Sequence, residues 1–137
     1  MIKEIEETSR NQKAKRIAVF SAYSDNKRIN NEVIYFLKEL SKYVDGIVFI
    51  ADNDFSKDEL SKISKYVIYS DCQHHGKYDF GSYSKGFQWF RQSDYYDKTD
   101  EIIFCNDSPS NWIGESFCFG KKWKNDWFCY VALLFIL

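Results

Sequence analysis

The stretch Gly76-Lys77-Tyr78-Asp79-Phe80-Gly81-Ser82-Tyr83 decides how the middle of this chain folds. Its aromatic residues begin a series, Phe80, Tyr83, Phe87 and Phe90, with steps of three, four and three residues. That spacing places the four rings on one stripe of an α-helix. The two glycines stand where the chain turns into this helix. The stretch therefore predicts an amphipathic helix that opens from a glycine-containing loop.

Asp79 precedes the aromatic stripe and is the candidate cap of this helix. A carboxylate there accepts hydrogen bonds from first-turn N–H groups that have no partner within the helix. A helix start that opens from a glycine loop also suits an anion. The carboxylate opposes a bare phosphate pocket and favours contacts to hydroxyls or to a bridged cation. The alternative is that Asp79 only caps the helix and the glycines only make the turn.

Four short apolar runs lie on either side of this stretch and are predicted to be buried strands. They are residues 16–20, 47–50, 66–69 and 101–105. Three predicted helices separate these strands. The first has a 3.6-residue apolar stripe from Asn30 or Asn31 to about Tyr43, and the second begins with a capping box at Ser56. The third is the motif helix, which extends to about Gln92. Gly46 is expected to close the first helix, and the second should end near Lys65.

The order strand–helix–strand–helix–strand–helix–strand predicts an α/β domain, a three-layer Rossmann-like fold with a mainly parallel sheet of at least four strands. Right-handed crossovers bring the carboxyl ends of such strands to one edge, where ligands of open α/β sheets bind. Four polar segments should converge there. They are Ser21-Ala22-Tyr23, Asp52-Asn53, residues 71–79 and Asn106-Asp107-Ser108.

Two motifs, Gly76 to Phe87 and Tyr96 to Ser108, together resemble the rhamnan synthesis protein F family of bacterial glycosyltransferase-like proteins. That family carries a Gly-Tyr-Asp-Phe-Gly-Ala-Tyr-like motif, then a hydrophobic strand that ends in Asn-Asp-Ser. The resemblance covers about Lys15 to Ser108. It departs from the family pattern at Lys77, where the family usually has glycine, and it stops altogether after Ser108.

The resemblance implies a GT-A-type domain that binds a nucleotide-sugar donor. In such domains a divalent cation, Mg²⁺ or Mn²⁺, lies against the diphosphate, and Asp107 would be its protein ligand here. The alternative is that Asp107 and Ser108 only end the strand and start a turn. The candidate donor-binding residues are Tyr23, Asp52, Tyr78, Asp79, Gly81 and Asn106.

Three of these candidates have a plainer interpretation. Asp52 could accept hydrogen bonds from a base or a ribose hydroxyl, or it could be a solvated loop acid. Tyr23 could stack on a base, or it could pack at a loop edge. Tyr78, together with Phe80, is expected to anchor the loop in the core more than to touch a ligand.

Composition supports a globular single domain. The chain has 137 residues, 45% hydrophobic and 19% aromatic, and a net charge of −1, which gives no general attraction to nucleic acid or anionic membrane. The start of the chain has no continuous apolar run typical of a secretion signal, so a cytoplasmic location, extending to the inner face of the membrane, is expected. Cys72 with His74 and His75 could suggest a metal site, but the spacing lacks two close ligand pairs, and a polar loop is expected.

The chain divides by sequence into a leader (1–14), a nucleotide-sugar-binding half (15–108) and a divergent hydrophobic tail (109–137). The segment 127–137 is too short to cross a bilayer, which needs about 20 residues. It is either a buried strand or a terminus never selected to fold, and it should favour self-association or a membrane surface. A general base for sugar transfer is not recognisable after Ser108.

The resemblance and the residues together predict a glycosyltransferase-like protein of bacterial cell-surface polysaccharide synthesis (rhamnan or O-antigen), rhamnosyltransferase-like in type. The acceptor would be a polysaccharide or a lipid-linked sugar. The isolated chain is expected to show little or no transfer. The alternative is a non-catalytic, truncated α/β fragment that keeps the fold without turnover.

Overall fold

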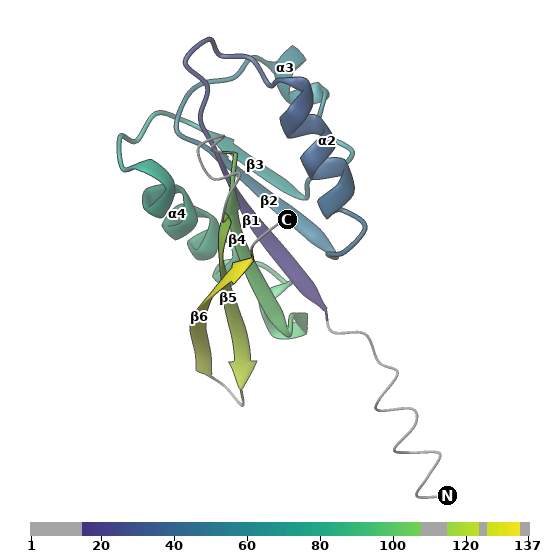
Figure 1. The fold of residues 1–137 in the computed structure, drawn as a ribbon, viewed down its shortest axis with the longest axis vertical. Coiled ribbons are helices and arrows are strands. Elements are labelled where there is room, and N and C mark those ends of the chain that lie inside the picture. Colours follow the sequence, from purple (N-terminus) through teal and green to yellow (C-terminus); the bar gives the residue numbers. More distant parts are fainter. Residues whose placement is uncertain (1–14, 108–114, 124–125, 135–137) are drawn as a thin grey trace, which may run out of the picture.

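The computed structural model describes residues 15–107, 115–123 and 126–134, which form an α/β domain with one six-stranded sheet (Figure 1). The predicted leader, Ser108 and part of the tail lie outside these residues. The strands are β1 (Arg16–Ala22), β2 (Gly46–Ala51), β3 (Tyr69–Cys72), β4 (Glu101–Asn106), β5 (Glu115–Trp123) and β6 (Asp126–Leu134). The helices are α2 (Asn31–Leu40), α3 (Lys57–Ser61), α4 (Tyr78–Gln92) and the short 3₁₀ turn η1 (Tyr96–Lys98).

The sheet has the order β3-β2-β1-β4-β5-β6, and β1 to β4 are all parallel. This confirms the predicted mainly parallel sheet and is compatible with a Rossmann-like fold. The two remaining strands, β5 and β6, are antiparallel and extend the sheet beyond β4. The chain order reverses at β1, whose neighbours are β2 on one side and β4 on the other. Ser21 of β1 is paired with Asn106 of β4 in the register of this junction.

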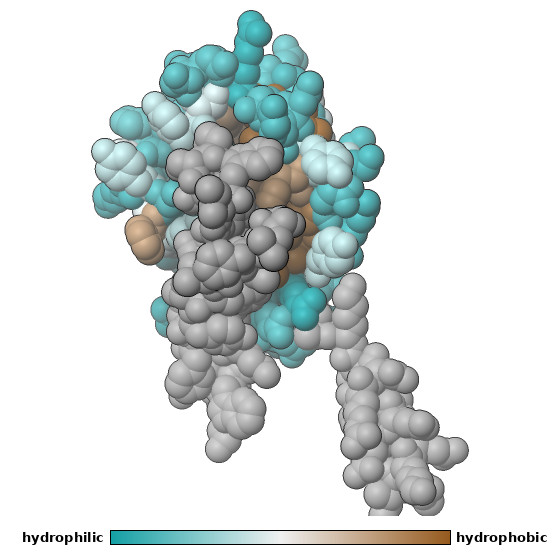
Figure 2. All heavy atoms as spheres, in the orientation of Figure 1, coloured by the Kyte–Doolittle hydropathy of each residue, from teal (hydrophilic) through white to brown (hydrophobic). Residues whose placement is uncertain are grey.

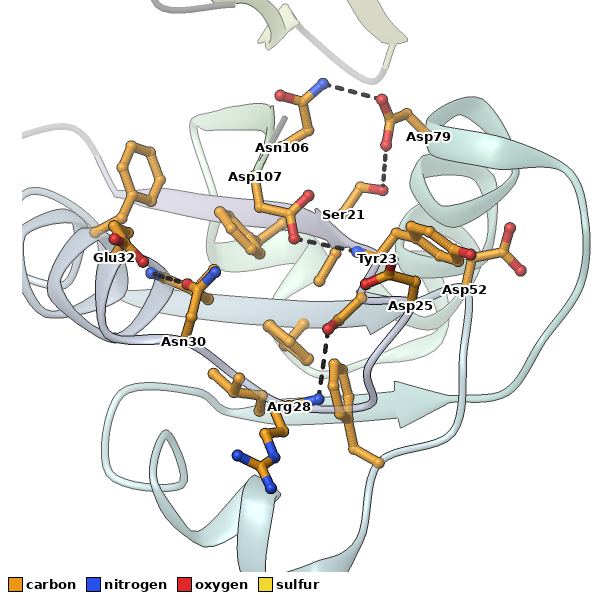
Figure 3. A pocket seen from close by; sticks show the side chains of 18 of the residues that line it. Ser21, Tyr23, Asp25, Arg28, Asn30, Glu32, Asp52, Asp79, Asn106 and Asp107 are labelled. Carbon is orange, nitrogen blue, oxygen red and sulfur yellow. Dashed lines mark hydrogen bonds between the residues drawn. The ribbon is translucent and has the colours of Figure 1, made fainter. Parts of the chain in front are cut away.

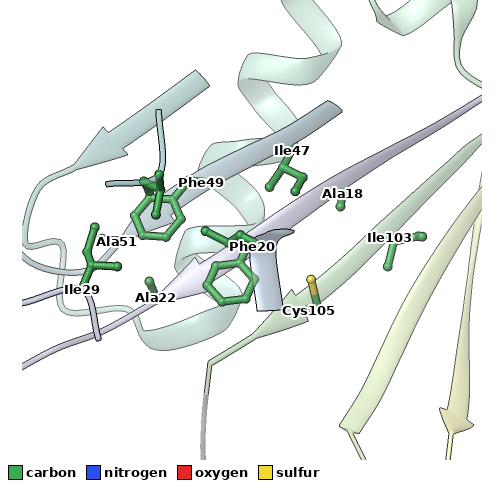
Figure 4. Close-up of a cluster of buried hydrophobic side chains, with 11 residues drawn as sticks. Ala18, Phe20, Ala22, Ile29, Ile47, Phe49, Ala51, Ile103 and Cys105 are labelled. Carbon is green, nitrogen blue, oxygen red and sulfur yellow. The ribbon is translucent and has the colours of Figure 1, made fainter. Parts of the chain in front are cut away.

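Alternating side chains of the central strands enter two cores, one on each face of the sheet. Ala18, Phe20 and Ala22 of β1 pack with Phe49 on the face covered by α2 and α3 (Figure 4). The residues between them, Ile17 and Val19, pack on the other face against α4. Because strand side chains alternate between faces, this pattern continues to the strand ends. It fixes the face on which each polar side chain of the edge emerges.

The third strand begins three residues later than predicted. Most of the predicted apolar run, Tyr66 to Tyr69, belongs to the loop between α3 and β3. The N–H of Tyr66 donates to the carbonyl of Ile63 in a turn, and Tyr66 and Val67 pack against the α2 side of the core. β3 is instead the polar segment Tyr69–Cys72 beside β2. Hydrophobicity marked residues that cover the core rather than residues that pair, so the predicted boundary was wrong.

The prediction that Gly46 closes the first helix was wrong, because α2 ends at Leu40 with Ser41 as its cap. Gly46 is instead the first residue of β2. A Cβ at this position would lie 2.7 Å from Cδ1 of Ile68 and 3.1 Å from Cδ1 of Ile17. The glycine is therefore needed for close packing, which no turn signal reveals.

The capping box at the start of α3 is half confirmed. Ser56 accepts a hydrogen bond from the Glu59 N–H at 3.2 Å, as predicted. The Glu59 carboxylate does not complete the box: it accepts from the Ile29 N–H at 2.7 Å and pairs with Lys62. α3 ends at Ser61, before the predicted Lys65. Glu59 therefore fixes the loop that precedes α2.

The motif helix α4 ends at Gln92 as predicted. Tyr83, Phe87 and Phe90 pack against the sheet, but Phe80 is 85% exposed, so the predicted stripe holds for three of its four rings. Gly86 lets this helix approach the sheet closely, because a Cβ there would lie 2.4 Å from Cγ1 of Val19. The close approach brings the first turn of α4 to the carboxyl ends of the strands.

Candidate functional site

A cavity of about 1370 Å³ opens at the carboxyl ends of β1, β2 and β4 and extends along α2. Its floor is apolar and includes Phe20, Ile29, Phe36 and Phe49. Figure 2 shows apolar residues at the bottom of a hollow beside α2, with hydrophilic residues on the α2 side of it. The polar rim includes Ser21, Tyr23, Asp25, Arg28, Asn30, Glu32, Asp52, Asp79, Asn106 and Asp107 (Figure 3). This is the predicted edge of the sheet.

Strand alternation brings Ser21, Asp52 and Asn106 to the α4 face of this edge. Each stands an even number of residues after a side chain of the α4-facing core, such as Val19, Ile50 and Phe104. Asp107 follows one position later, at the point where the strand ends. The site is therefore built from the ends of three neighbouring strands and the first turn of one helix.

Asp79 does not cap α4, because the N-cap is Lys77, which makes no side-chain capping bond, and Asp79 lies inside the first turn. Its carboxylate reaches both central strands instead. Oδ1 accepts from the Ser21 hydroxyl at 2.8 Å and Oδ2 accepts from the Asn106 side-chain amide at 3.0 Å (Figure 3). Asn106 also hydrogen-bonds the Tyr83 hydroxyl. The carboxylate joins helix and sheet across the junction of β1 and β4.

Asp107 shares the cavity with Asp79, as predicted from the two strand ends. Its Oδ2 accepts from the Tyr23 N–H at 3.1 Å. Burial raises the pKa of the Asp107 carboxyl to about 6; the charge of Asp79 adds to the rise, while the N–H groups of Tyr23 and of Asp107 itself oppose it. An ionised Asp107 is therefore a costly charge that a cation or a proton would offset.

Asp52 is buried, with 7% of its surface exposed, so it is not the solvated loop acid of the plainer interpretation. Its Oδ1 accepts from the N–H groups of His75 and Gly76 at 2.6 and 2.9 Å. Burial by itself would raise the pKa of Asp52, but these two N–H groups and the nearby histidines lower it. In Figure 3 its carboxylate points away from that of Asp107. Asp52 thus shapes the loop between β3 and α4.

The aromatic residues of the rim are exposed. Tyr23 is 60% exposed and Tyr78 is 82% exposed. The prediction that Tyr78 and Phe80 anchor the loop in the core was therefore wrong. Tyr78 has a φ of 57°, a left-handed conformation that is unusual for a residue other than glycine. Gly81 lies under the loop, because a Cβ there would meet Cβ of Lys77 at 2.3 Å and the His75 ring at 2.9 Å. Gly81 is therefore needed for packing of the loop.

A cation would find oxygen donors at this rim but no protein cage. Asp79, Asn106 and Asp107 offer the carboxylate and amide oxygens that Mg²⁺ accepts, with water and phosphate completing the shell. Within 15–107, where side chains are described, no group of three or more His, Cys, Asp or Glu residues could hold a metal ion. Burial raises the pKa of the Cys72 thiol to about 11, so it is not a thiolate at neutral pH.

No family model, curated protein or solved structure matches the chain. Among the described helices, none is long and apolar enough to cross a membrane.

Ser21, Asn53 and His75 lie in the converging segments but were not among the predicted donor-binding residues. Ser21 is 1% exposed and bonds Asp79, and Asn53 accepts from the Ser24 N–H at 3.0 Å. The signal for Ser21 was present: a serine that continues a buried strand needs a hydrogen-bond partner. The identity of that partner follows only from the packing of α4.

Proposed function

We propose that this domain binds a nucleotide-activated sugar in the cavity at the carboxyl edge of the sheet, as part of a glycosyltransferase-like protein of bacterial cell-surface polysaccharide synthesis. The fold proposed with this function is the three-layer, GT-A-type domain that the motif resemblance implies. The observation that carries the proposal is the position of the cavity. It lies at the ends of β1 and β4, where the strand order reverses, and ligands of open α/β sheets bind at such a junction.

The shape and lining of the cavity suit a ligand with an aromatic ring and a polar portion. The apolar floor between α2 and the sheet belongs to a cavity of about 1370 Å³, which has the volume to take a base, and the exposed ring of Tyr23 stands at the rim. Polar donors and acceptors, among them Arg28 and Asn30, line the same rim. A nucleotide could therefore place its base on the floor and its sugar and phosphates along the rim.

The charge of the rim predicts that a diphosphate binds with a divalent cation. Asp25, Glu32, Asp52, Asp79 and Asp107 line the cavity with Arg28. A diphosphate alone would meet net negative charge, which a hard cation neutralises. Asp107 is the residue that would hold the cation, because its burial already disfavours an uncompensated carboxylate. Bound there, Mg²⁺ would stabilise the charge that develops on a departing diphosphate.

Calorimetric titration of the full chain with uridine, thymidine and guanosine diphosphates, with and without Mg²⁺, tests the proposal. We expect binding that requires Mg²⁺ and that Asp107→Asn abolishes while the circular dichroism spectrum stays unchanged. Asp94→Asn is the matched control, because Asp94 is exposed and lies outside the cavity lining. If no diphosphate binds to the folded chain with Mg²⁺, the proposal is wrong.

Binding without turnover is the second candidate, and one observation favours it. Both oxygens of Asp79 already accept hydrogen bonds from Ser21 and Asn106, which gives this carboxylate a structural role. Sugar transfer needs donor, acceptor and base held together. A transfer assay with a panel of nucleotide sugars and lipid-linked acceptors, run beside light scattering, separates the two candidates. Multiple turnovers by the monomer would exclude the non-catalytic one.

A further inference from the structure

His75, in the loop between β3 and α4, has a largely enclosed side chain with both ring nitrogens engaged. Its side chain is 9% exposed. Nδ1 accepts a hydrogen bond from the Lys77 N–H at 3.0 Å, and Nε2 lies 2.9 Å from the Ser82 hydroxyl oxygen. A backbone N–H can only donate, so Nδ1 carries no proton here and the neutral ring holds its proton on Nε2. One tautomer of His75 thus ties the loop to the start of α4, through the N-cap residue Lys77 and through Ser82 in the following turn.

Ser82, His75 and Asp52 have the residue types of a hydrolytic triad, but their geometry excludes that role. Ser82 is fully buried, so no substrate reaches its hydroxyl. In a triad the histidine Nδ1–H donates to the carboxylate. Here Nδ1 accepts from Lys77, and Oδ1 of Asp52 lies 3.5 Å from it. The three side chains hold the loop and the helix together.

Charged and titratable side chains lie on each of the segments next to the loop that carries His75. Asp52 follows β2, His74 and Lys77 belong to the same loop, Asp79 and Lys85 are on α4, and Asp71 is on β3. The carboxylate of Asp79 is bonded to Ser21 and Asn106, and Lys85 lies 3.5 Å from Asp71. The exposed His74 lies 3.3 Å from Oδ1 of Asp52. Oδ1 of Asp52, at 3.5 Å, is the anionic oxygen that the described residues place beside Nδ1 of His75.

We propose that His75 is a proton-operated positioning residue that holds the first turn of α4, and with it Asp79, at the edge of the sheet. When Nδ1 takes a proton it can no longer accept from the Lys77 N–H, and it pairs with Asp52 instead. Histidine is the side chain that ordinarily changes charge between pH 5 and 8. Mild acid therefore releases the first turn.

Nuclear magnetic resonance of the ¹⁵N-labelled full chain tests this directly. At pH 8 we expect imidazole nitrogen shifts that place the proton of His75 on Nε2. Between pH 8 and 5.5 the amide exchange of Lys77 to Ser82, corrected for its intrinsic pH dependence, should increase about fivefold, as the loss of one hydrogen bond implies. A proton on Nδ1 at pH 8, or corrected exchange that stays constant, would overturn the proposal.

Two variants separate the proton step from general loosening of the loop. His75→Asn places a non-titrating acceptor near the position of Nδ1 and should remove the pH step. His74→Asn, at the exposed neighbouring histidine, should leave it unchanged. A step that persists in His75→Asn, or disappears in His74→Asn, contradicts the assignment to His75. If His75→Asn does not fold, the imidazole nitrogen shifts and the amide exchange of the unmodified chain decide whether the proposal holds.

One consequence rests on the proposed function: Mg²⁺–nucleotide binding should weaken several-fold between pH 8 and 5.5 through release of Asp79. His75→Asn should reduce this pH dependence, and what remains is the contribution of other groups such as Asp107. Equal affinities at the two pH values would overturn the coupling to the cavity. If no nucleotide binds at any pH, the proposed function is wrong, and the exchange measurement still decides on His75.

Discussion

The side-chain amide of Asn106 donates to the carboxylate of Asp79 across 3.0 Å, and this bond joins the last residue of β4 to the first turn of α4. The second oxygen of Asp79 accepts from Ser21, the partner of Asn106 in the β1–β4 register. One carboxylate thus holds two strand ends and a helix start at the junction where the strand order reverses. Whatever the cavity binds, its rim depends on this contact.

Removal of the Asp79 carboxylate should destabilise the fold. Asp79→Ala leaves the buried Ser21 hydroxyl and the Asn106 amide without this acceptor, which costs roughly 2 to 3 kcal/mol in the free energy of unfolding. Urea unfolding followed by circular dichroism measures the change. The exposed Asp94→Ala should stay within about 0.5 kcal/mol of the unmodified chain. Equal effects of the two substitutions would show that the contact contributes little.

The raised pKa of Asp107 predicts how stability depends on pH. The pKa is about 6 in the folded chain and 3.8 as the ordinary value, so the folded state binds the proton more tightly. Stability from this group is full below about pH 4 and is lost as the pH rises through about 6. Asp107→Asn should remove this decline. Unfolding free energies of both chains at pH 4.5 and 7.5 give the comparison, and parallel profiles would contradict the shift.

Gly86 should tolerate no side chain. Gly86→Ala would bring Cβ within 2.4 Å of Cγ1 of Val19, in the core between α4 and the sheet, and overpacking of this kind costs about 1 to 3 kcal/mol. Ser84→Ala, at an exposed position of the same helix, should be neutral or stabilising. Thermal unfolding of the two variants is the measurement. A stable Gly86→Ala variant would mean that α4 lies farther from the sheet.

Tyr78 is a position where glycine should be better than tyrosine. Its φ of 57° costs about 1 to 2 kcal/mol in a residue with a Cβ, and Tyr78→Gly relieves it. The greater conformational freedom of glycine in the unfolded chain offsets roughly 0.5 to 1 kcal/mol of that stabilisation. We expect a net increase of about 0.5 kcal/mol in the free energy of unfolding. Ser84→Gly, at an ordinary helical position, should instead lose about 0.5 to 1 kcal/mol.

Local patterns in the sequence determined the elements and the class of fold. The runs at 16–20, 47–50 and 101–105 are mostly apolar without alternation, which is typical of a covered parallel strand, and each became a strand. The aromatic stripe that ends at Phe90 specified α4, which ends two residues later at Gln92. Loops that follow parallel strands must share one edge, so the meeting of Asp79 and Asp107 at one cavity was also predictable.

Tertiary packing decided what the sequence left open. Tyr66 and Val67 cover the core while the polar Tyr69–Cys72 pairs with β2, because strand pairing depends on neighbours that hydrophobicity does not report. Asp79 lies inside the first turn of α4 and bonds Ser21 and Asn106 instead of capping the helix. No local pattern in the chain links Asp52, His75 and Ser82. Only the docking of α4 on the sheet brings them into one hydrogen-bonded network. A sequence records which groups can donate and accept, whereas the fold decides which of them are close enough to bond.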